Sequence, residues 1–479
     1  MYLQYRKADM IGQAKKLIKS VIGFDSFPFV WWHTIQAIYG NLKYNFPSRK
    51  IVVIGVTGTN GKTTTCLAIA HLLVSQGKKV AAFTTAQCRM GDKVWLNESK
   101  MTTLGRAGVQ KFIFDAVVEG CEYVVLETSS HALYYGRTWG VAYDVCVFTN
   151  LTQDHLDLHR TMERYAEAKK ILFMQTAKSF KKDFLDPGSR QSTALSGMTE
   201  GKPGRGTLTK GAVVNIDDAY ASRYLGIDGL RYITVGQEID KAPTYLLSNL
   251  TTQVDGIEFN IIQNEKPGLP LSGYTSRNDI KVKSVLMGEF NMYNLAEAVA
   301  TGELLGFERE TLCKSLETFS GVPGRLERVE NTKDLTILVD YAHTADALDQ
   351  VLSMLYAVKT GSLKIVFGAT GDRDKDKRPK MAAVAAKYCD EIIITTDDPY
   401  TESAQTIADE VYLGIPEDKK AITHIVLDRK EAIVQALKNS KPHDMILIAG
   451  KGCEPVMVVG DQKIPWSDRG VVEEYLKQY

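Results

Sequence analysis

The residues with the clearest chemistry lie in the segment 51–65, which has the sequence IVVIGVTGTNGKTTT. Its four leading aliphatic residues predict a buried strand. The glycine-rich loop that follows leads into a predicted helix, where backbone N–H groups can hold a phosphate. Gly58 and Gly61 would let the backbone approach the phosphate oxygens. Lys62 could reach the terminal phosphates of a nucleotide, and the hydroxyl of Thr63 could bind Mg²⁺. This segment therefore predicts nucleotide binding, although it does not define a reaction.

One position departs from the strict phosphate-loop pattern. That pattern has glycine where Val56 stands, so the generic motif is not met. The alternative interpretation is a glycine-rich turn with a surface lysine. The strand before the loop, the Gly-Lys pair and the run of threonines together favour nucleotide binding.

Polar side chains also follow two later apolar runs. Glu127 comes directly after the run 123–126, and His155 lies shortly after the run 145–148. The carboxyl ends of neighbouring parallel strands meet at one edge of a sheet, where a carboxylate can bind the Mg²⁺ of a nucleotide. Either residue alone would be interpreted as a loop or capping residue. Two successive strand ends with ligand-type side chains favour a metal site.

Short apolar runs alternate with helical stretches through the first two thirds of the chain. This order predicts a P-loop-type, mostly parallel α/β sheet with crossover helices. Residues 245–262 alternate apolar and polar side chains, which indicates an antiparallel hairpin or edge strands, and residues 181–210 indicate a mobile surface loop. After a break at 321–324 the alternation restarts and predicts a second, Rossmann-like α/β domain. We expect a short helical, aromatic-rich segment at 1–50, a central nucleotide-binding domain at 51–324 and a C-terminal domain at 325–479.

Composition limits the class of protein. The chain has 479 residues, of which 44% are hydrophobic and 24% charged, and its formal net charge is +1. These values are ordinary for a globular protein and exclude collagen-like, coiled-coil and wholly disordered chains. They give no overall signal for nucleic acid, and no apolar run is long enough to predict a membrane span. The seven cysteines form no CxxC pair and no secretory signal opens the sequence, so we expect a cytoplasmic protein.

Nine segments, in order along the chain, resemble the Mur ligase family. This family comprises ATP-dependent amide-forming ligases of cell-wall precursor synthesis and also includes folylpolyglutamate synthase. Within it, the chain is most similar to the branch that adds the third amino acid of the peptide stem to a UDP-N-acetylmuramoyl peptide. The matching segments are GTNGKTT at 58–64, ETSSH at 127–131, TNLTQDHLD at 149–157, YAEAK at 165–169, GEFNMYN at 288–294, GRLE at 324–327, DYAHT at 340–344, GDRDKDKRP at 371–379 and GKGCE at 450–454.

The resemblance implies ATP, two Mg²⁺ ions and a lysine carbamylated by CO₂ in the active site. The implied ATP-binding residues are Gly58, Thr59, Asn60, Gly61, Lys62, Thr63, Thr64, Asn291, Asn294, Arg325 and Asp340. The implied metal ligands are Thr63, Glu127, His155 and Lys169 as its carbamate, and the implied catalytic residues are Lys62, Glu127, His155, Lys169 and Arg325. From the sequence alone, Lys169 is an ordinary helix-surface lysine. Asn291 and Asn294 are equally well explained as a helix N-cap pair.

The resemblance also implies a muramoyl-peptide acceptor and an amino acid as substrates. The implied acceptor residues are Thr102, Thr103, Ser129 and Arg137, and the implied amino-acid residues are Arg373, Asp397, Asp398, Gly450 and Glu454. The family sequence for diaminopimelate is Asp-Asn-Pro-Arg, whereas residues 397–400 read DDPY. Asp398 could pair with an ammonium, which favours lysine, although diaminopimelate also carries one. The alternatives are a helix N-cap for Asp398 and a solvated loop residue for Arg137; Cys453 and Ala345 replace a usual histidine and proline.

The chain departs from the family before the phosphate loop. The usual member has roughly 100 residues there that bind uridine diphosphate, whereas this chain has only the leader 1–50. The aromatic cluster FVWW at 29–32 either docks on the central domain as core, stacks on uracil, contacts a membrane surface or binds a partner protein. The sequence carries no signal of oligomeric state.

Two other functions remain open at this point. One is the same chemistry on another acceptor, as in folylpolyglutamate synthase or a poly-amino-acid ligase. The other is a non-catalytic, nucleotide-binding partner protein. The segments at 127–131 and 450–454 favour the wall-precursor branch, and the presence of Lys169, His155 and Arg325 favours an enzyme.

Overall fold

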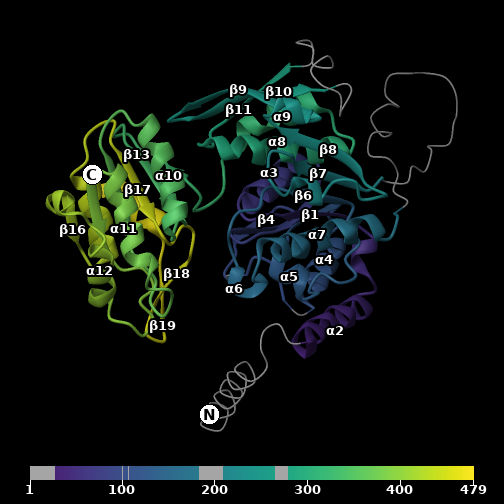
Figure 1. The fold of residues 1–479 in the computed structure, drawn as a ribbon, viewed down its shortest axis with the longest axis horizontal. Coiled ribbons are helices and arrows are strands. Elements are labelled where there is room, and N and C mark those ends of the chain that lie inside the picture. The colour runs from purple at the N-terminus through teal and green to yellow at the C-terminus, as the bar shows by residue number, and fades with distance from the viewer. Residues whose placement is uncertain (1–26, 100, 106, 183–208, 265–278, 479) are drawn as a thin grey trace, which may run out of the picture.

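The computed structural model describes residues 27–99, 101–105, 107–182, 209–264 and 279–478. Two large sheets, each with helices on both faces, lie side by side (Figure 1). The strands of the first sheet come from residues 52–284 and those of the second from residues 327–449. The predicted α/β fold is therefore confirmed. Most of the expected loop at 181–210 and the leader before residue 27 lie outside the described residues.

Eleven strands form the first sheet. They are β1 (Val52–Thr57), β2 (Val80–Phe83), β3 (Gln87–Met90), β4 (Lys93–Leu96), β5 (Tyr123–Glu127), β6 (Val145–Phe148), β7 (Gly211–Asn215), β8 (Arg231–Gly236), β9 (Tyr245–Gln253), β10 (Gly256–Gln263) and β11 (Asp279–Ser284). Their order is β11-β10-β9-β8-β7-β6-β1-β5-β2-β3-β4. The strands from β9 to β2 are parallel neighbours, and antiparallel pairs extend both edges. The predicted hairpin at 245–262 is confirmed as β9 and β10.

Helices cover both faces of this sheet and bury its apolar side chains. One face packs on α3 (Lys62–Ser75), α8 (Glu289–Leu304) and α9 (Arg309–Ser315). The other packs on α4 (Gly108–Val118), α5 (Ser130–Tyr134) and α7 (Met162–Lys178), which follows the short α6 (Leu156–His159). Because α3 packs against α8 as well as the sheet, the helix that begins at the phosphate loop is held on two sides.

The second sheet has a parallel core. Its strands are β12 (Glu327–Val329), β13 (Thr336–Asp340), β14 (Leu363–Phe367), β15 (Glu391–Ile394), β16 (Thr423–Ile425) and β17 (Met445–Ala449), in the order β12-β13-β17-β14-β15-β16. One face packs on α10 (Ala345–Val358), α11 (Lys377–Tyr388) and α12 (Ala404–Tyr412). The other packs on α13 (Arg429–Lys438) and α14 (Asp468–Gln478). Strands β18 (Val456–Val459) and β19 (Gln462–Pro465) form a separate ribbon.

The register of the first sheet brings its functional strand ends together. Glu127, the last residue of β5, pairs with Val56 of β1, and Phe148, the last residue of β6, pairs with Thr57. The segments that follow β1, β5 and β6 therefore leave the sheet at one edge, which is where ligands bind in parallel α/β sheets.

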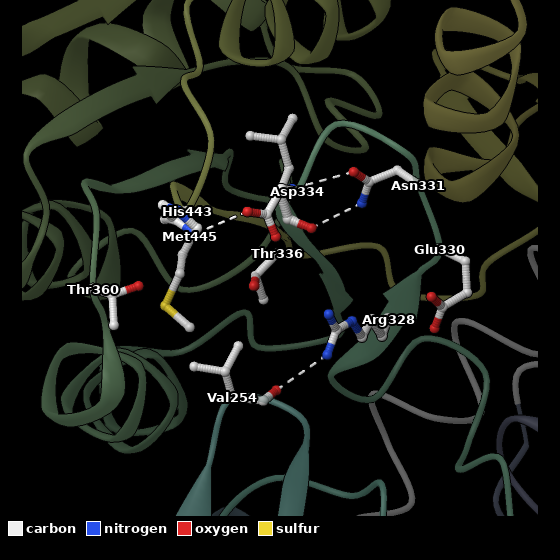
Figure 2. A pocket seen from close by; sticks show the side chains of 10 residues that line it. Val254, Arg328, Glu330, Asn331, Asp334, Thr336, Thr360, His443 and Met445 are labelled. Carbon is white, nitrogen blue, oxygen red and sulfur yellow. Dashed lines mark hydrogen bonds and ion pairs between the residues drawn. The ribbon is translucent and has the colours of Figure 1, made fainter.

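The tip of the β9–β10 hairpin contacts the second sheet. Arg328 of β12 donates a hydrogen bond through Nη1 to the carbonyl of Val254 at 3.3 Å (Figure 2). A pocket of about 280 Å³ lies beside this contact and is lined in part by Thr336 and Met445. These two residues begin β13 and β17, so the pocket lies at the opposite end of the strands from Asp340. It is separate from the site described below.

A buried ionic cluster ties the segment before β6 to two lysines. Asp144 is fully buried and accepts hydrogen bonds from the ammonium groups of Lys182 and Lys210. Both lysines also donate to backbone carbonyl groups, including that of Ile51. Lys182 and Lys210 are therefore both anchored at the first sheet.

Removing the anion of this cluster should destabilise the protein strongly. In Asp144→Ala the two lysines stay buried without their charge partner, and we expect a loss of about 3–5 kcal/mol in unfolding free energy. Denaturant titration followed by circular dichroism measures the change. The control is Glu474→Ala, which breaks a half-exposed pair with Lys430 and should cost less than about 1 kcal/mol. Equal effects of the two substitutions would contradict the role given to Asp144.

Helix α2 (Phe27–Lys43) corrects one sequence interpretation. The aromatic cluster is not core at Trp31 and Trp32, which are 54% and 59% exposed. The physical reason is that the packed side of α2 includes the small or polar residues Ala37, Gly40 and Asn41, and Trp31, Trp32 and Tyr39 face outward. In the part of the chain that the structure describes, no helix is long and apolar enough to cross a membrane.

Candidate active site

The phosphate loop connects β1 to α3 and requires glycine at two positions. Gly58 and Gly61 have φ values of +155° and +81°. A Cβ atom on Gly58 would lie 1.9 Å from Oγ1 of Thr149, and one on Gly61 would lie 2.1 Å from Oδ1 of Asn294. Neither position has room for a side chain, so the loop keeps this shape only with glycine there.

The segment after β6 fixes the rest of the loop. The N–H groups of Thr59 and Asn60 donate to the main-chain and side-chain oxygens of Asn150 at 2.8 and 2.9 Å. The hydroxyl of Thr149 donates to the carbonyl of Asn60 at 2.6 Å. Thr64 lies in the first turn of α3. The loop is therefore shaped by neighbouring side chains before any ligand arrives.

Asn291 and Asn294 lie behind the loop and are not a helix N-cap pair. Helix α8 is capped by Gly288, and both asparagines are buried inside its first turns. The Nδ2 atom of Asn294 donates to Oδ1 of Asn291 at 2.9 Å, and Nδ2 of Asn291 donates to the carbonyl of Met287 at 2.7 Å. The hydroxyl of Thr65 donates to Oδ1 of Asn294 at 3.4 Å. The side chain of Asn294 thus packs directly against the loop.

Glu127 and Thr63 place oxygen ligands beside the loop. Glu127 is 2% exposed, and its two carboxylate oxygens accept hydrogen bonds from the Thr63 hydroxyl at 3.0 and 3.1 Å. The N–H of Thr85 also donates to this carboxylate at 2.6 Å. Among the described residues, no group of three or more His, Cys, Asp or Glu side chains could hold a metal ion. Mg²⁺ at such a site takes its remaining ligands from phosphate oxygens and water.

Two lysines converge on the loop carbonyls, the partly buried Lys62 and the buried Lys169. Lys62 donates to the carbonyl of Thr59 at 2.6 Å, and Lys169 donates to the carbonyl of Gly58 at 2.7 Å. Burial lowers the pKa of Lys62. Burial, reinforced by the charge of Lys62, holds the pKa of Lys169 well below its ordinary value. Lys169 is only 1% exposed, so its sequence interpretation as a helix-surface lysine is wrong.

His155 lies at the start of α6, near both the loop and α7. Its Nε2 atom is 3.3 Å from Oδ2 of Asp154, and its ring centre is 4.6 Å from that of His131 and 6.2 Å from that of Tyr165. The ammonium of Lys169 lies 4.2 Å from the centre of the same Tyr165 ring. His155 has a φ of +53°, an uncommon conformation for this residue type. One tyrosine ring therefore connects the regions of His155 and Lys169.

Three of the four predicted acceptor residues lie around Glu127. The Thr103 hydroxyl donates to the carbonyl of Glu127 at 2.8 Å and accepts from the N–H of Ser129 at 3.0 Å. The hydroxyl of Thr102 lies 3.1 Å from that of a threonine in the loop after β2. Arg137 follows α5, and its buried Nε atom has no hydrogen-bond partner among the residues that the structure describes. Arg137 is thus a partly buried side chain whose Nε–H group donates no hydrogen bond to the described residues.

Arg325 approaches the phosphate loop from the second sheet. Its guanidinium carbon lies 4.6 Å from the ring centre of Tyr341. Burial lowers the pKa of Lys62, and the charge of Arg325 adds to this effect, so the two cations act on the same region. Asp340 is buried at the end of β13, and its Oδ2 atom accepts from the N–H of Leu326 at 2.7 Å. Asp340 therefore holds the segment that carries Arg325.

Three carboxylates gather around one buried ammonium at the carboxyl edge of the second sheet. The Nζ atom of Lys451 lies 2.8 Å from Asp398, 3.5 Å from Asp397 and 3.2 Å from Glu454. Lys451 is fully buried. Helix α12 is capped by Ser403, so Asp398 is not its N-cap. Lys377 and the buried Arg429 also feel the charge of Asp397, so Lys451 is not the sole cation near these carboxylates.

Gly450 and Arg373 lie near the same cluster. Gly450 has a φ of +110°, and a Cβ atom there would lie 2.8 Å from Oδ2 of Asp397. Arg373 is exposed on the loop after β14. Burial lowers the pKa of Lys377; Asp397 opposes this shift and Arg373 adds to it, which places all three charges within reach of one another.

Two protein-family models match the chain. The Mur ligase middle domain matches residues 56–181, and the Mur ligase glutamate ligase domain matches residues 324–452. The UDP-N-acetylmuramoyl-L-alanyl-D-glutamate–2,6-diaminopimelate ligase of Bacillus cereus is 35% identical over 91% of this chain and 80% of its own length. The enzyme of that name from Geobacter metallireducens is 38% identical, with coverages of 90% and 79%. The chain belongs to the Mur ligase family.

As a Mur ligase, the chain is a carbon–nitrogen ligase, so the enzyme interpretation is confirmed over the non-catalytic one. A solved structure of a UDP-N-acetylmuramoyl-L-alanyl-D-glutamate–2,6-diaminopimelate ligase covers 93% of this chain and 83% of its own, with a TM-score of 0.63 and 28% identity. A folylpolyglutamate synthase from Thermotoga maritima has a TM-score of 0.59 at 14% identity, covering 93% of each chain, and shows the shared fold alone.

Sequence reasoning missed two residues of this Mur ligase site. Lys451 pairs with Asp398, the carboxylate that we predicted from the sequence to pair with a substrate ammonium. Tyr165 contacts Lys169 and also lies 3.3 Å from the Thr59 hydroxyl through its own OH group. A lysine between two glycines directly after an apolar run was a usable signal for Lys451. Tyr165 had none, since a tyrosine in a predicted helix is most often core.

A single methyl group should block the phosphate loop. Gly61→Ala places Cβ against Asn294, and we expect ATP binding to weaken by about a hundredfold or more, because the loop must shift to relieve the contact. Isothermal titration calorimetry measures the affinity. The control is Gly77→Ala, which has a similar φ of +71° but no atom within 4 Å of the added carbon. If both variants bind ATP like the wild type, the loop is not the nucleotide site.

Proposed function

We propose that this Mur ligase is ATP-dependent and adds an amino acid with a cationic side chain to the terminal carboxylate of a UDP-N-acetylmuramoyl dipeptide. The names of its relatives support this acceptor and the diamino-acid class. The observation that carries the proposal is the pair of lysines, the partly buried Lys62 and the buried Lys169, held at the phosphate loop beside Glu127. In the proposal, Lys62 supplies a preorganised cation for phosphoryl transfer, and Lys169 supplies the amine that becomes the carbamate. We place the reaction in the cytoplasm, where ATP is available.

ATP is held between the two sheets in this proposal. The backbone of the loop binds the phosphates, Lys62 meets the terminal ones, and Arg325 reaches the γ-phosphate from the second sheet. The fixed position of Arg325 beside the charge of Lys62 supports this arrangement. The ATP-binding residues are Gly58, Thr59, Asn60, Gly61, Lys62, Thr63, Thr64, Asn291, Asn294, Arg325 and Asp340.

The side chains beside the loop fit Mg²⁺. The oxygens of Thr63 and Glu127 meet within 3.1 Å, and oxygen donors are what this ion prefers. In the proposal, Thr63 and Glu127 hold the nucleotide ion, and Glu127, His155 and the carbamate of Lys169 hold the second. When bound, Mg²⁺ would neutralise negative charge on the transferred phosphoryl group.

The charge state of Lys169 supports its carbamylation. Burial favours the neutral amine, which can attack CO₂, form an N–C bond and release a proton. The product is an anion, so the neighbouring charge of Lys62 attracts it. The carbamate nitrogen keeps one N–H for the carbonyl of Gly58, where the amine donates a hydrogen bond.

The proposed reaction has two steps. The acceptor carboxylate attacks the γ-phosphorus of ATP and gives an acyl phosphate and ADP. The amino group of the second substrate then attacks the acyl carbon, the amide forms and phosphate leaves. The first two reactants are both anions, so Lys62 and Arg325 are needed to offset their repulsion. Thr102, Thr103, Ser129 and Arg137 bind the acceptor, and the unpartnered Nε of Arg137 supports an anionic group there.

The carboxylate cluster of the second sheet supports a cationic amino acid. Asp397, Asp398 and Glu454 converge at this point, and a carboxylate is the group that pairs with a substrate ammonium. Gly450 and Arg373 complete the proposed amino-acid site. We further propose that two lobes, 51–324 and 325–479, close about residues 321–324 to bring the amine to the acyl phosphate.

The test is ADP release by the purified chain with defined substrates. We expect turnover with UDP-N-acetylmuramoyl-L-alanyl-D-glutamate and either lysine or diaminopimelate, and a rate at least about a hundredfold lower with glutamate. A folate acceptor serves as the negative control. Turnover with folate, or no amino-acid-dependent turnover with the muramoyl dipeptide, would overturn the proposal.

A further inference from the structure

The exposed apolar side chains of helix α2 lie on one side of the helix. Trp31, Ile35, Tyr39 and Leu42 follow one another at spacings of four and three residues, and Trp32 lies beside them. Their side chains are between 47% and 64% exposed. At 100° per residue these positions share one side of the helix. A face of this kind on a described, packed helix is a surface that something else covers.

The body of the enzyme fixes the direction of this face. On the opposite side of α2, Nδ2 of Asn41 donates to the carbonyl of Trp139 at 2.8 Å. Gly40 lies so close to α4 that an added Cβ would be 3.0 Å from Cβ of Ala107. The ring of His33 lies 5.6 Å from that of Tyr135. The apolar face therefore points away from the protein, at the edge of the molecule (Figure 1).

The apolar surface continues from α2 onto α4. Tyr44, just after α2, packs its ring 5.2 Å from that of Phe114, which is 36% exposed. Val118, one turn further along α4, is 70% exposed. Two exposed helices thus contribute side chains to one patch, which we name the α2 face: Trp31, Trp32, Ile35, Tyr39, Leu42, Phe114 and Val118.

The charge along the α2 part of the α2 face is positive. Helix α2 contains no Asp or Glu, and Lys43 lies over the rings of Tyr39 and Tyr44 at 5.8 and 5.4 Å. Among residues 1–50, eight are Lys or Arg and two are Asp, a net charge of +6 in a chain whose total is +1. The other 429 residues therefore carry a net charge of −5. In the sequence, positive charge is therefore concentrated in the segment that contains the exposed aromatic residues.

We propose that the α2 face docks on the surface of an anionic lipid bilayer. Trp and Tyr side chains favour the headgroup region, where an apolar ring and a polar tip are both accommodated. An amphipathic helix with lysine at its rim lies in the plane of the interface, and anionic lipid attracts the surrounding cations. The docking does not depend on the identity of the substrates.

Vesicle binding tests the proposal with the full chain. We expect sedimentation with vesicles that contain phosphatidylglycerol, weaker binding to pure phosphatidylcholine, and release at high salt. The affinity of the variant Trp31→Ser/Trp32→Ser/Tyr39→Ser for the anionic vesicles should be at least about tenfold lower than that of the wild type. The control, Trp95→Ser/Tyr356→Ser, changes the same residue types at sites that are 44% and 51% exposed and should bind like the wild type.

Each alternative occupant gives a different result. If the wild type is a dimer without lipid and the triple variant a monomer, the face is an interface between copies and the proposal is overturned. Binding that is equal for wild type and triple variant also overturns it. Because the substituted side chains are exposed, the triple variant should keep the unfolding midpoint and the rate of ADP release with soluble substrates. If the wild type itself releases no ADP with the soluble substrates, the result counts against the proposed function and not against the docking.

Discussion

Lys169→Ala is expected to lower amino-acid-dependent ADP release by about a thousandfold, equivalent to about 4 kcal/mol of transition-state stabilisation. The substitution removes the amine that we propose to carry the carbamate, and with it a ligand of the second Mg²⁺. Lys169 is buried against the carbonyl of Gly58 and the ring of Tyr165, so no neighbouring lysine can replace it. Steady-state kinetics at saturating Mg²⁺ measures the effect.

Chemical rescue separates this role from a structural one. Added acetate or another short carboxylic acid should restore part of the activity of Lys169→Ala, because the space left by the side chain admits a carboxylate. Lys170→Ala, which changes the next lysine on α7, is the matched control and should keep wild-type activity. Full activity in Lys169→Ala would refute the carbamate role, and a loss without any rescue would indicate a structural role.

Glu127→Gln is expected to reduce the rate of ADP release by about a hundredfold or more. The amide keeps the size of the side chain and can still accept the hydrogen bond of Thr63, but it removes the negative charge that we assign to Mg²⁺ binding. The requirement for Mg²⁺ should shift to higher concentration. A titration of the rate against Mg²⁺ measures both changes.

Glu122→Gln provides the comparison for this variant. Glu122 precedes the same strand, is 46% exposed and pairs with Lys78 on the surface, so its loss should leave both the rate and the Mg²⁺ requirement unchanged. If Glu127→Gln has the same Mg²⁺ dependence as the wild type, then this carboxylate does not hold the ion, and the metal lies elsewhere.

The sequence was most informative where chemistry coincided with a strand end. The apolar runs before Gly58, Glu127 and His155 predicted parallel strands, and the observed register places those strand ends at one edge. Local pattern suffices for this step because parallel strands buried on both faces are uniformly apolar. The hairpin at 245–262 followed from its alternating pattern in the same way.

Contacts between distant segments could not be predicted from the pattern. The approach of Asn294 to Gly61 and the pairing of Asp398 with Lys451 depend on how helices and loops pack, which periodicity does not encode. The burial of Lys169 is of the same kind. A lysine on a predicted helix is normally solvated, and only the packing of α7 at the phosphate loop encloses this one.

Helix α2 shows how composition alone misleads. Aromatic residues are usually buried, so the cluster at 29–32 was best explained as core. In the structure, the packed side of α2 consists of Ala37, Gly40 and Asn41, because two helices approach closely where side chains are small. Trp31 and Trp32 are left outside, and this arrangement leads to the inference about lipid.

The transfer of an oxygen isotope tests the central claim most directly, namely that the acceptor carboxylate is activated by phosphoryl transfer at the loop of Lys62. The acceptor is prepared with ¹⁸O in its terminal carboxylate, and the released phosphate is analysed by mass spectrometry. The account predicts that each phosphate carries one ¹⁸O atom, because a carboxylate oxygen becomes the bridging oxygen of the acyl phosphate and leaves with phosphorus. Amide formation with unlabelled phosphate would contradict it.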